Sequence, residues 1–550
     1  MPVTPASDAE SRFDRTVERW FRERMAIDPV MATYLGLHEH DAELPDDSRE
    51  QIERRVAALR SSVAEMERFA ADDLSADRAL DRDLLIHEAQ LELHELEERR
   101  SWSGRSDAAE SLGRALFPLF TRHFAPFATR LEAIASRLEA APRFLAEARS
   151  RVLAPVQLWA ELDLEATLAL PVFVDSILAA AGAEHVEAPL LARLEGSVRD
   201  AKAALERHSE WLRHEVLPKA EADWRAGREG FEQLLALRAL EADGDQILAI
   251  GESRLEEATA ARDALCAEID PNISPAEVGE EIKADHPASF AEVLAAYRAA
   301  IARARTFVVE HDLMTFPEHD QIVVLETPTY ERHVTPFAAY YDPAAFDLEP
   351  VGTYLVTPPE TPEMMREHSY ASISNTSVHE AYPGHHLQLA VAMSNPSRIR
   401  LLAQSATEYI EGWAFYAERM MKEAGFDNTP AHRYIFQTDI VWRACRIILD
   451  VKLHRGQIAL DDAVTFLVQR TGFERPAAVA EVNWYTAAPT YPLSYLYGRH
   501  MIEQLRADVA RRMGPAFSLR FFHDTFVYGG TMPVSFTRRL FETRLDGLAR

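Results

Sequence analysis

The stretch EQLLALRALEADGDQILAIGESRLEEATAARDAL, residues 232–265, has the spacing of apolar residues that decides the fold class of the chain. Its apolar residues recur at intervals of three and four, the spacing that places them on one face of an α-helix. Strong helix formers dominate it and glycine is scarce. The same pattern runs through residues 8–265, so we expect this half of the chain to consist of antiparallel helices.

The residue pattern changes near residues 270–282, and the segments that follow predict a small β-sheet. Three short segments are rich in β-branched and aromatic residues and are bounded by prolines: QIVVLETP (321–328), PFAAYYDP (336–343) and VGTYLVTPP (351–359). Such segments are typical of short strands. The last of them either offers an exposed edge to an extended peptide or lies inside the sheet.

From about Met364 the helical spacing returns and lasts to the C-terminus. The sequence therefore predicts a mainly α-helical protein with one small mid-chain sheet. We expect an N-terminal helical lobe, residues 1–270, and a catalytic lobe, residues 271–550, that work as one unit.

Composition narrows the class of protein. The chain has 550 residues, 47% of them hydrophobic, and a formal net charge of −29. The charge would repel a phosphate backbone, so we expect no nucleic-acid partner. The two cysteines, Cys266 and Cys445, make no disulfide framework and suit a reducing compartment. We see no secretion signal and no uninterrupted apolar run of about 18 residues, so we expect a cytoplasmic protein without a membrane span.

The stretch SVHEAYPGHHLQ, residues 377–388, carries the clearest chemical signal. The usual zinc-hydrolase motif is HExxH, in which two histidines one helical turn apart face one ion and the glutamate acts as base. Here Pro383 stands where the second histidine would be, and His385 and His386 follow.

On an unbroken helix His385 would point far away from His379, so the helix must break for both to bind one metal. Pro383 lacks an N–H, and Gly384 allows backbone angles closed to other residues. A local bulge could then bring His385 beside His379. His386 is the alternative ligand, and whichever histidine does not bind metal would contact another ligand or the substrate.

A third ligand is expected from ATEYIEGWAFYAERMM, residues 406–421, which is predicted to be a helix. Glu411 and Glu418 are seven residues apart and share a face that is otherwise apolar. A carboxylate beside apolar residues is costly unless it is paired or bound to metal. We predict Glu411 as the ligand and Glu418 as a residue that orients a ligand histidine. Alternatively, both are exposed acids on an amphipathic helix.

Several motifs together resemble a bacterial family catalogued as domain of unknown function 885. They are HEAYPGHHLQ, EGWAFYAE, YPLSYLYGR, DPVMATYLGLHEHD and YYDPAAFDLEPVGTYLVTPP. That family is grouped with the gluzincin metallopeptidases, whose zinc ligands are two histidines and a downstream glutamate. The resemblance therefore implies a metallopeptidase-like helical architecture with a cleft between two lobes. It also implies that a tyrosine late in the chain, here Tyr495, stabilises the oxyanion.

The expected function is that of a zinc-dependent hydrolase with one zinc per chain. His379, His385 and Glu411 would hold the ion, Glu380 would act as base, and the expected substrates are short peptides. Arg499 is a candidate to bind a substrate carboxylate, or else a surface arginine. Two alternatives stay open: a zinc amidohydrolase acting on a non-peptide amide, and a helical binding protein with a degenerate site. Nothing in the sequence predicts the oligomeric state.

Overall fold

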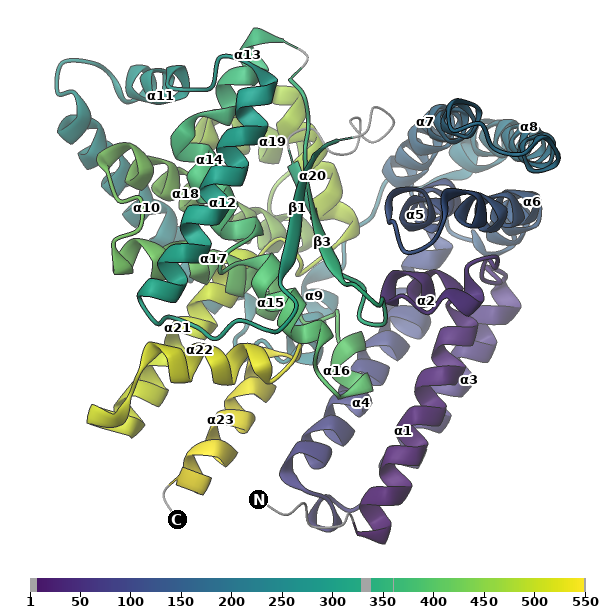
Figure 1. Ribbon diagram of the computed structural model, residues 1–550, viewed down its shortest axis with the longest axis horizontal. Coiled ribbons are helices and arrows are strands. Elements are labelled where there is room, and N and C mark those ends of the chain that lie inside the picture. The colour runs from purple at the N-terminus through teal and green to yellow at the C-terminus, as the bar shows by residue number, and fades with distance from the viewer. Residues whose placement is uncertain (1–6, 328–337, 360, 549–550) are drawn as a thin grey trace. The chain divides into compact units, whose positions relative to one another are not determined.

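The computed structural model describes residues 7–327, 338–359 and 361–548 (Figure 1). These residues form a mainly helical protein with one three-stranded sheet, as the sequence predicts. The chain divides into two compact units. The first is Met1–Trp224 with Ala344–Pro350, and the second is Arg225–Pro343 with Val351–Arg550. Residue 270, where we expected the lobes to divide, falls inside the second unit.

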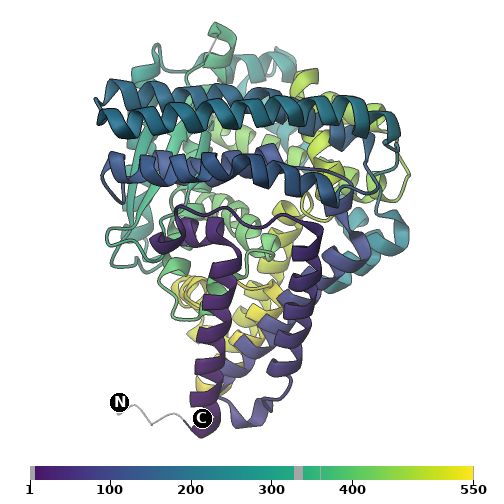
Figure 2. The ribbon, with the colours of Figure 1, turned by 90° about the vertical axis from the view of Figure 1, so that its right-hand side faces the viewer.

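The first unit contains eight long or medium helices among its described residues. They are α1 (Asp8–Ile27), α2 (Pro29–Leu35), α3 (Arg49–Met66), α4 (Ala76–His94), α5 (Ala108–Thr121), α6 (Phe127–Arg151), α7 (Gln157–Ala183) and α8 (Ala188–Trp211). Helices α5 to α8 pack on one another as a bundle, and α3 packs against α4. Figure 2 shows the long helices of this bundle lying side by side.

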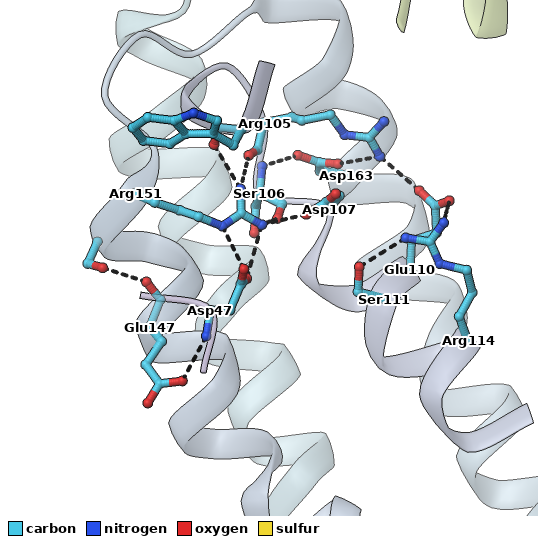
Figure 3. A network of polar contacts seen from close by, with 12 residues as sticks. Asp47, Arg105, Ser106, Asp107, Glu110, Ser111, Arg114, Glu147, Arg151 and Asp163 are labelled. Carbon is cyan, nitrogen blue, oxygen red and sulfur yellow. Dashed lines mark hydrogen bonds and ion pairs between the residues drawn. The ribbon is translucent and has the colours of Figure 1, made fainter. Parts of the chain in front are cut away.

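A buried polar network ties the loop before α5 to the bundle (Figure 3). Arg151, only 4% exposed, donates to both carboxylate oxygens of Asp47 at 3.0 Å and to the carbonyl oxygens of Trp102 and Arg105. Asp163 accepts from the backbone N–H of Ser106 at 2.7 Å. Burial, which outweighs the nearby arginines, raises the pKa of Asp47 and of Asp163 to about 6. The guanidinium thus satisfies loop carbonyls that would otherwise be buried without partners.

Residues 344–350 belong to the first unit although they connect two strands of the second. The Phe346 N–H donates to the Leu35 carbonyl at 2.9 Å. His38 lies between Asp41 and Asp347, with each ring nitrogen 3.0 Å from a carboxylate oxygen. These hydrogen bonds raise the pKa of His38 to about 9 despite its partial burial. The motif DPVMATYLGLHEHD, residues 28–41, therefore holds residues 344–350 in place through these hydrogen bonds.

Helix α7 bears on the expectation that the chain has no membrane span. It is long and apolar enough to cross a membrane by length and composition alone, and 33% of its most apolar window is buried. The apolar run is not uninterrupted, because residues 166–183 contain Asp175 as their one charged residue. Core helices of soluble proteins pass the same test, so the finding by itself is weak evidence of a span.

The second unit holds the remaining described α-helices. They are α9 (Gly227–Leu237), α10 (Gly244–Ile269), α11 (Pro275–Ala284), α12 (Phe290–Glu310), α13 (Pro362–Met365), α14 (Tyr370–Glu380), α15 (His385–Met393), α16 (Arg398–Leu402), α17 (Thr407–Ala424), α18 (Pro430–His454), α19 (Leu460–Thr471), α20 (Arg475–Ala487), α21 (Ser494–Met513), α22 (Leu519–Tyr528) and α23 (Val534–Leu548). The most extensive helix contacts are those of α10 with α18 and of α17 with α21, and α12 packs on α14.

The three predicted strands are confirmed as β1 (Gln321–Glu326), β2 (Ala338–Tyr341) and β3 (Val351–Val356). The first two residues of the predicted middle segment lie outside the described residues. The strand order is β1-β3-β2, with β3 parallel to β1 and antiparallel to β2. Because β3 is the central strand, the interpretation of VGTYLVTPP as an exposed edge is wrong, and the internal one holds.

Candidate metal centre

The helix break predicted inside the histidine motif is confirmed. Helix α14 ends at Glu380 and α15 begins at His385. The Gly384 N–H donates to the Val378 carbonyl at 3.0 Å, and any Cβ on Gly384 would overlap the carbonyl oxygen of His379. Glycine is therefore required where the chain folds back on the end of α14. The indole N–H of Trp413, on α17, donates to the Pro383 carbonyl at 2.8 Å and fixes the turn from outside.

The break brings two imidazoles together, and α17 adds a carboxylate. The rings of His379 and His385 have centroids 4.9 Å apart. Oε2 of Glu411 lies 3.2 Å from Nε2 of His385 and 3.9 Å from Nε2 of His379. One ligand atom from each of the three residues lies within 4.8 Å of the others. Tetrahedral zinc, with bonds of about 2.0–2.1 Å, holds its ligand atoms about 3.3–3.5 Å apart. The His385–Glu411 separation of 3.2 Å is close to that spacing, and the His379–Glu411 separation of 3.9 Å would have to shorten by about 0.5 Å.

His386 has different partners. Its Nε2–H donates to the Asp320 carbonyl at 3.1 Å, which leaves Nδ1 to accept from the Tyr340 hydroxyl at 2.8 Å. Both ring nitrogens are therefore engaged away from Glu411. A Cβ on Gly352 would lie 2.6 Å from Nδ1 of His386, so the sheet rests directly on the start of α15. The structure groups His385, rather than His386, with His379 and Glu411.

Glu418, the predicted orienting residue, contacts His379. The Nδ1–H of His379 donates to Oε1 of Glu418 at 2.7 Å, so Nε2 is the nitrogen that faces Glu411. Metal-bound histidines almost always have such a carboxylate or carbonyl partner. Burial is the largest influence on His379 and lowers its pKa to about 4. Its imidazole is therefore neutral near pH 7, the form that binds metals.

Two tyrosines lie near Glu411: Tyr491, in the turn before α21, and Tyr495, in the first turn of α21. The Tyr491 hydroxyl donates to Oε1 of Glu411 at 3.1 Å. Tyr495 interacts electrostatically with Glu411. Burial would raise the pKa of Glu411, but the hydrogen bond and charge of His385 lower it to about 2. Burial raises the pKa of Tyr495 above its usual value, so its phenol keeps its proton and remains a donor.

Tyr497, also on α21, and the candidate Arg499 have partners of their own. The Tyr497 hydroxyl donates to the Leu240 carbonyl at 2.8 Å. Nε of Arg499 donates to Glu503 at 2.9 Å, and its guanidinium lies 4.9 Å from the centre of the Phe415 ring. Arg499 is 4% exposed, so it is not a surface arginine. A contact between Arg499 and a substrate carboxylate stays a prediction.

Sequence reasoning missed two glycines that set the spacing of the site. A Cβ on Gly412 of α17 would lie 2.6 Å from the backbone carbon of Gly498 on α21. A Cβ on Gly498 would in turn overlap the backbone carbonyl of Glu408. The two helices therefore touch backbone to backbone. This contact sets the distance between Glu411, next to Gly412, and the tyrosines at the start of α21.

Sequence reasoning also missed Asn375 and Asp439. Nδ2 of Asn375 donates to Glu418 and to Asp439, at 2.8 Å in both cases. Asn375 precedes His379 by four residues, which places it one turn earlier on the same face of α14. That spacing is the one sequence signal that could have identified it.

Two solved structures share the fold. A protein provisionally described as a lipoprotein of unknown function, from Shewanella oneidensis, matches with a TM-score of 0.79 and 22% identity, over 96% of this chain and 99% of its own. A protein from Colwellia psychrerythraea, also provisionally described as a lipoprotein, matches with a TM-score of 0.83 and 19% identity, over 98% of this chain and 99% of its own. No functionally curated protein matches the chain.

These comparisons overturn the prediction of a cytoplasmic location, because lipoproteins are anchored to a membrane or exported. The prediction relied partly on the scarcity of cysteine. Cys266 and Cys445 are both buried and free, so their thiols are shielded from an oxidising medium as well as from a reducing one. Cysteine usage therefore does not distinguish the compartments here.

The model of a family described as "Bacterial protein of unknown function (DUF885)" matches residues 29–540. That range covers most of both compact units and every residue of the candidate metal centre. The chain belongs to the DUF885 family.

Proposed function

We propose that this chain is a zinc-dependent hydrolase, and specifically a metallopeptidase that cleaves short peptides. One observation carries the proposal: ligand atoms of His379, His385 and Glu411, from three helices, lie within 4.8 Å of one another. Two histidines and one carboxylate form a donor set that suits zinc. Three protein ligands leave a position open, which is the arrangement of a catalytic rather than a structural zinc site.

The chain supplies a base next to this group. A zinc ion there would polarise a carbonyl and bring the pKa of an attacking water towards about 7. Glu380 follows His379 directly and interacts electrostatically with both His379 and His385. In the proposed reaction Glu380 accepts a proton from the attacking water and then gives it to the leaving amine.

Tyr495 is the proposed donor to the oxyanion. Its protonated phenol lies beside Glu411, on the side of the site that α21 covers. A donor aimed at the position where negative charge develops contributes about 10²–10³-fold to rate in comparable sites. Tyr491 reaches the same carboxylate and is the rival for this role.

The first test is the metal content of protein purified without added metal, for wild type and His379→Ala. About one zinc per chain, lost in the variant, is expected. Glu380→Gln should keep the zinc and lose turnover of a defined peptide mixture, and Tyr495→Phe should retain zinc with a slower rate. Cleavage of simple amides but not of peptides would favour the amidohydrolase alternative. A wild-type protein without zinc would leave the degenerate-site alternative and refute the proposal.

A further inference from the structure

We propose that Asn375 and Asp439 are positioning residues for the metal centre. The carboxamide of Asn375 holds Glu418 in the orientation in which Glu418 accepts the Nδ1–H of His379. The inference rests on the proposed function in one respect, because it takes His379 to bind an ion through Nε2.

The contacts form a continuous chain from the metal ligand into the protein. Glu418 accepts from His379 through Oε1, at 2.7 Å, and from Nδ2 of Asn375 through Oε2, at 2.8 Å. The same Nδ2 donates to Oδ2 of Asp439 at 2.8 Å. A side-chain NH₂ group carries two hydrogens, so one nitrogen can serve two carboxylates at once.

The far end of the chain is anchored by a cation. Nη1 of Arg443 donates to Oδ1 of Asp439 at 2.9 Å. The guanidinium of Arg443 lies 4.0 Å from the centre of the Trp442 ring, which restricts its movement. Asp439 and Arg443 both lie on α18, whereas Asn375 lies on α14 and Glu418 on α17. Three helices are therefore linked through one amide.

The orientation of the Asn375 amide follows from its neighbours. If the amide were turned over, its oxygen would face two carboxylates, which in their ionised form are acceptors only. With Nδ2 towards Glu418 and Asp439, Oδ1 has no hydrogen-bond partner among the described residues. An unmet acceptor is a cost that the two hydrogen bonds to charged groups offset.

Because Glu418 and Asn375 are buried, the hydrogen bond between them controls the orientation of Glu418. Glu418 is 1% exposed and Asn375 is 2% exposed, so bulk water cannot replace the amide. A carboxylate held at both oxygens cannot rotate about its last side-chain bond. The direction of the His379 Nδ1–H, and with it the direction of Nε2, is then fixed by the chain. Without Asn375, Glu418 would keep its contact with His379 but lose the second hydrogen bond that sets its plane.

The test measures zinc affinity by competition with a chelator, without any activity assay. The variants are Asn375→Ala, Glu418→Gln and the double variant. Asn395→Ala is the matched control, because Asn395 is a partly buried amide of the same unit that donates to Tyr528 and not to the site. Asn375→Ala should weaken zinc binding about tenfold, the lower end of the effect of residues that orient metal ligands. Because Asn375 acts through Glu418, the double variant should bind about as weakly as Glu418→Gln alone.

A second readout is the visible absorption of the Co²⁺-substituted protein, which reports the geometry of the ligands. The spectrum should change in Asn375→Ala and stay that of wild type in Asn395→Ala. Asp439→Asn keeps the side-chain volume and should also weaken zinc binding, which provides a test if Asn375→Ala does not fold.

Wild-type zinc affinity and an unchanged cobalt spectrum in Asn375→Ala would overturn the inference and leave the proposed function standing. So would additive losses in the double variant, or unchanged zinc affinity in Asp439→Asn where Asn375→Ala does not fold. A wild-type protein that binds no zinc would overturn both the inference and the proposed function.

Discussion

Replacing Gly412 by alanine tests whether α17 and α21 touch through their backbones. The added Cβ would lie 2.6 Å from the carbonyl carbon of Gly498 and 2.7 Å from its Cα. Carbon atoms in contact are ordinarily about 3.5 Å or more apart. The two helices must therefore separate locally by about 0.9 Å, or other atoms must move by a similar amount.

The size of the effect follows from two opposing contributions. Alanine in a helix is favoured over glycine by about 0.8–1.0 kcal/mol. Forcing an extra carbon into a packed contact costs about 1–3 kcal/mol. Gly230→Ala, on α9 of the same unit, is the matched control, because the nearest atom to its Cβ would be 3.8 Å away. The gain in helix propensity is common to both variants, so the difference between them isolates the steric cost of about 1–3 kcal/mol.

The assay is urea unfolding followed by circular dichroism, with zinc removed from every sample so that metal binding adds nothing to stability. Gly230→Ala should be more stable than wild type, and Gly412→Ala should be less stable than Gly230→Ala by the steric cost. A separation of about 0.9 Å would also lengthen the hydrogen bond from Tyr491 to Glu411 from 3.1 Å to about 4 Å, which breaks it. Equal stabilities for the two variants would refute the backbone contact and the spacing argument built on it.

Three further outcomes are expected. Gly384→Ala should abolish zinc binding and destabilise the protein by about 3 kcal/mol or more, because its Cβ would overlap the His379 carbonyl; metal analysis and urea unfolding check both effects. His386→Gln should keep one zinc per chain, because both ring nitrogens of His386 are bonded elsewhere, and loss of zinc in that variant would contradict the ligand assignment. Burial raises the pKa of Asp163 to about 6, above its value near 4 in the unfolded chain. Because the folded protein binds the carboxyl proton of Asp163 more tightly than the unfolded chain does, it loses stability as the pH rises from about 4 to about 6. Asp163→Asn removes this loss, so its stability relative to wild type should rise by about 2–3 kcal/mol between pH 4 and pH 7 in unfolding measured across that range, and a flat difference would contradict the raised pKa.

Local patterns predicted much of the fold. The three strands were identified from their β-branched and aromatic residues, and the helical halves from apolar spacing. The helix break was predicted from Pro383 and Gly384 because both act on the backbone at their own position. These are features that a chain carries within a few residues.

Features that depend on distant contacts could not be predicted. The sequence left His385 and His386 as alternatives, and the structure separates them through Tyr340 and the Asp320 carbonyl, which lie 46 and 66 residues away. Periodicity shows which face of a helix is apolar but not which helix covers it. For that reason VGTYLVTPP gave no information on whether its strand is central or at an edge, and Asn375 gave no sign of its link to Asp439.

The longer spacing of the histidine motif has a structural consequence. In a single-helix motif one backbone sets both imidazoles, but here His379 ends α14 and His385 begins α15. Their separation therefore depends on the turn between them. Gly384 sets that turn by its contact with the end of α14, and Trp413 fixes it by donating to the Pro383 carbonyl.

Trp413 lies on α17, two residues after Glu411. The helix that supplies the third candidate ligand therefore also fixes the position of the second. Glu418, on the same helix, orients the first through Nδ1 of His379. Helix α17 thus supplies or positions all three candidate ligands. The close contact between α17 and α21 at Gly412 and Gly498 places these ligands next to Tyr491 and Tyr495. The lengthened histidine motif can therefore keep its ligand atoms close together, because another helix, α17, positions both histidines.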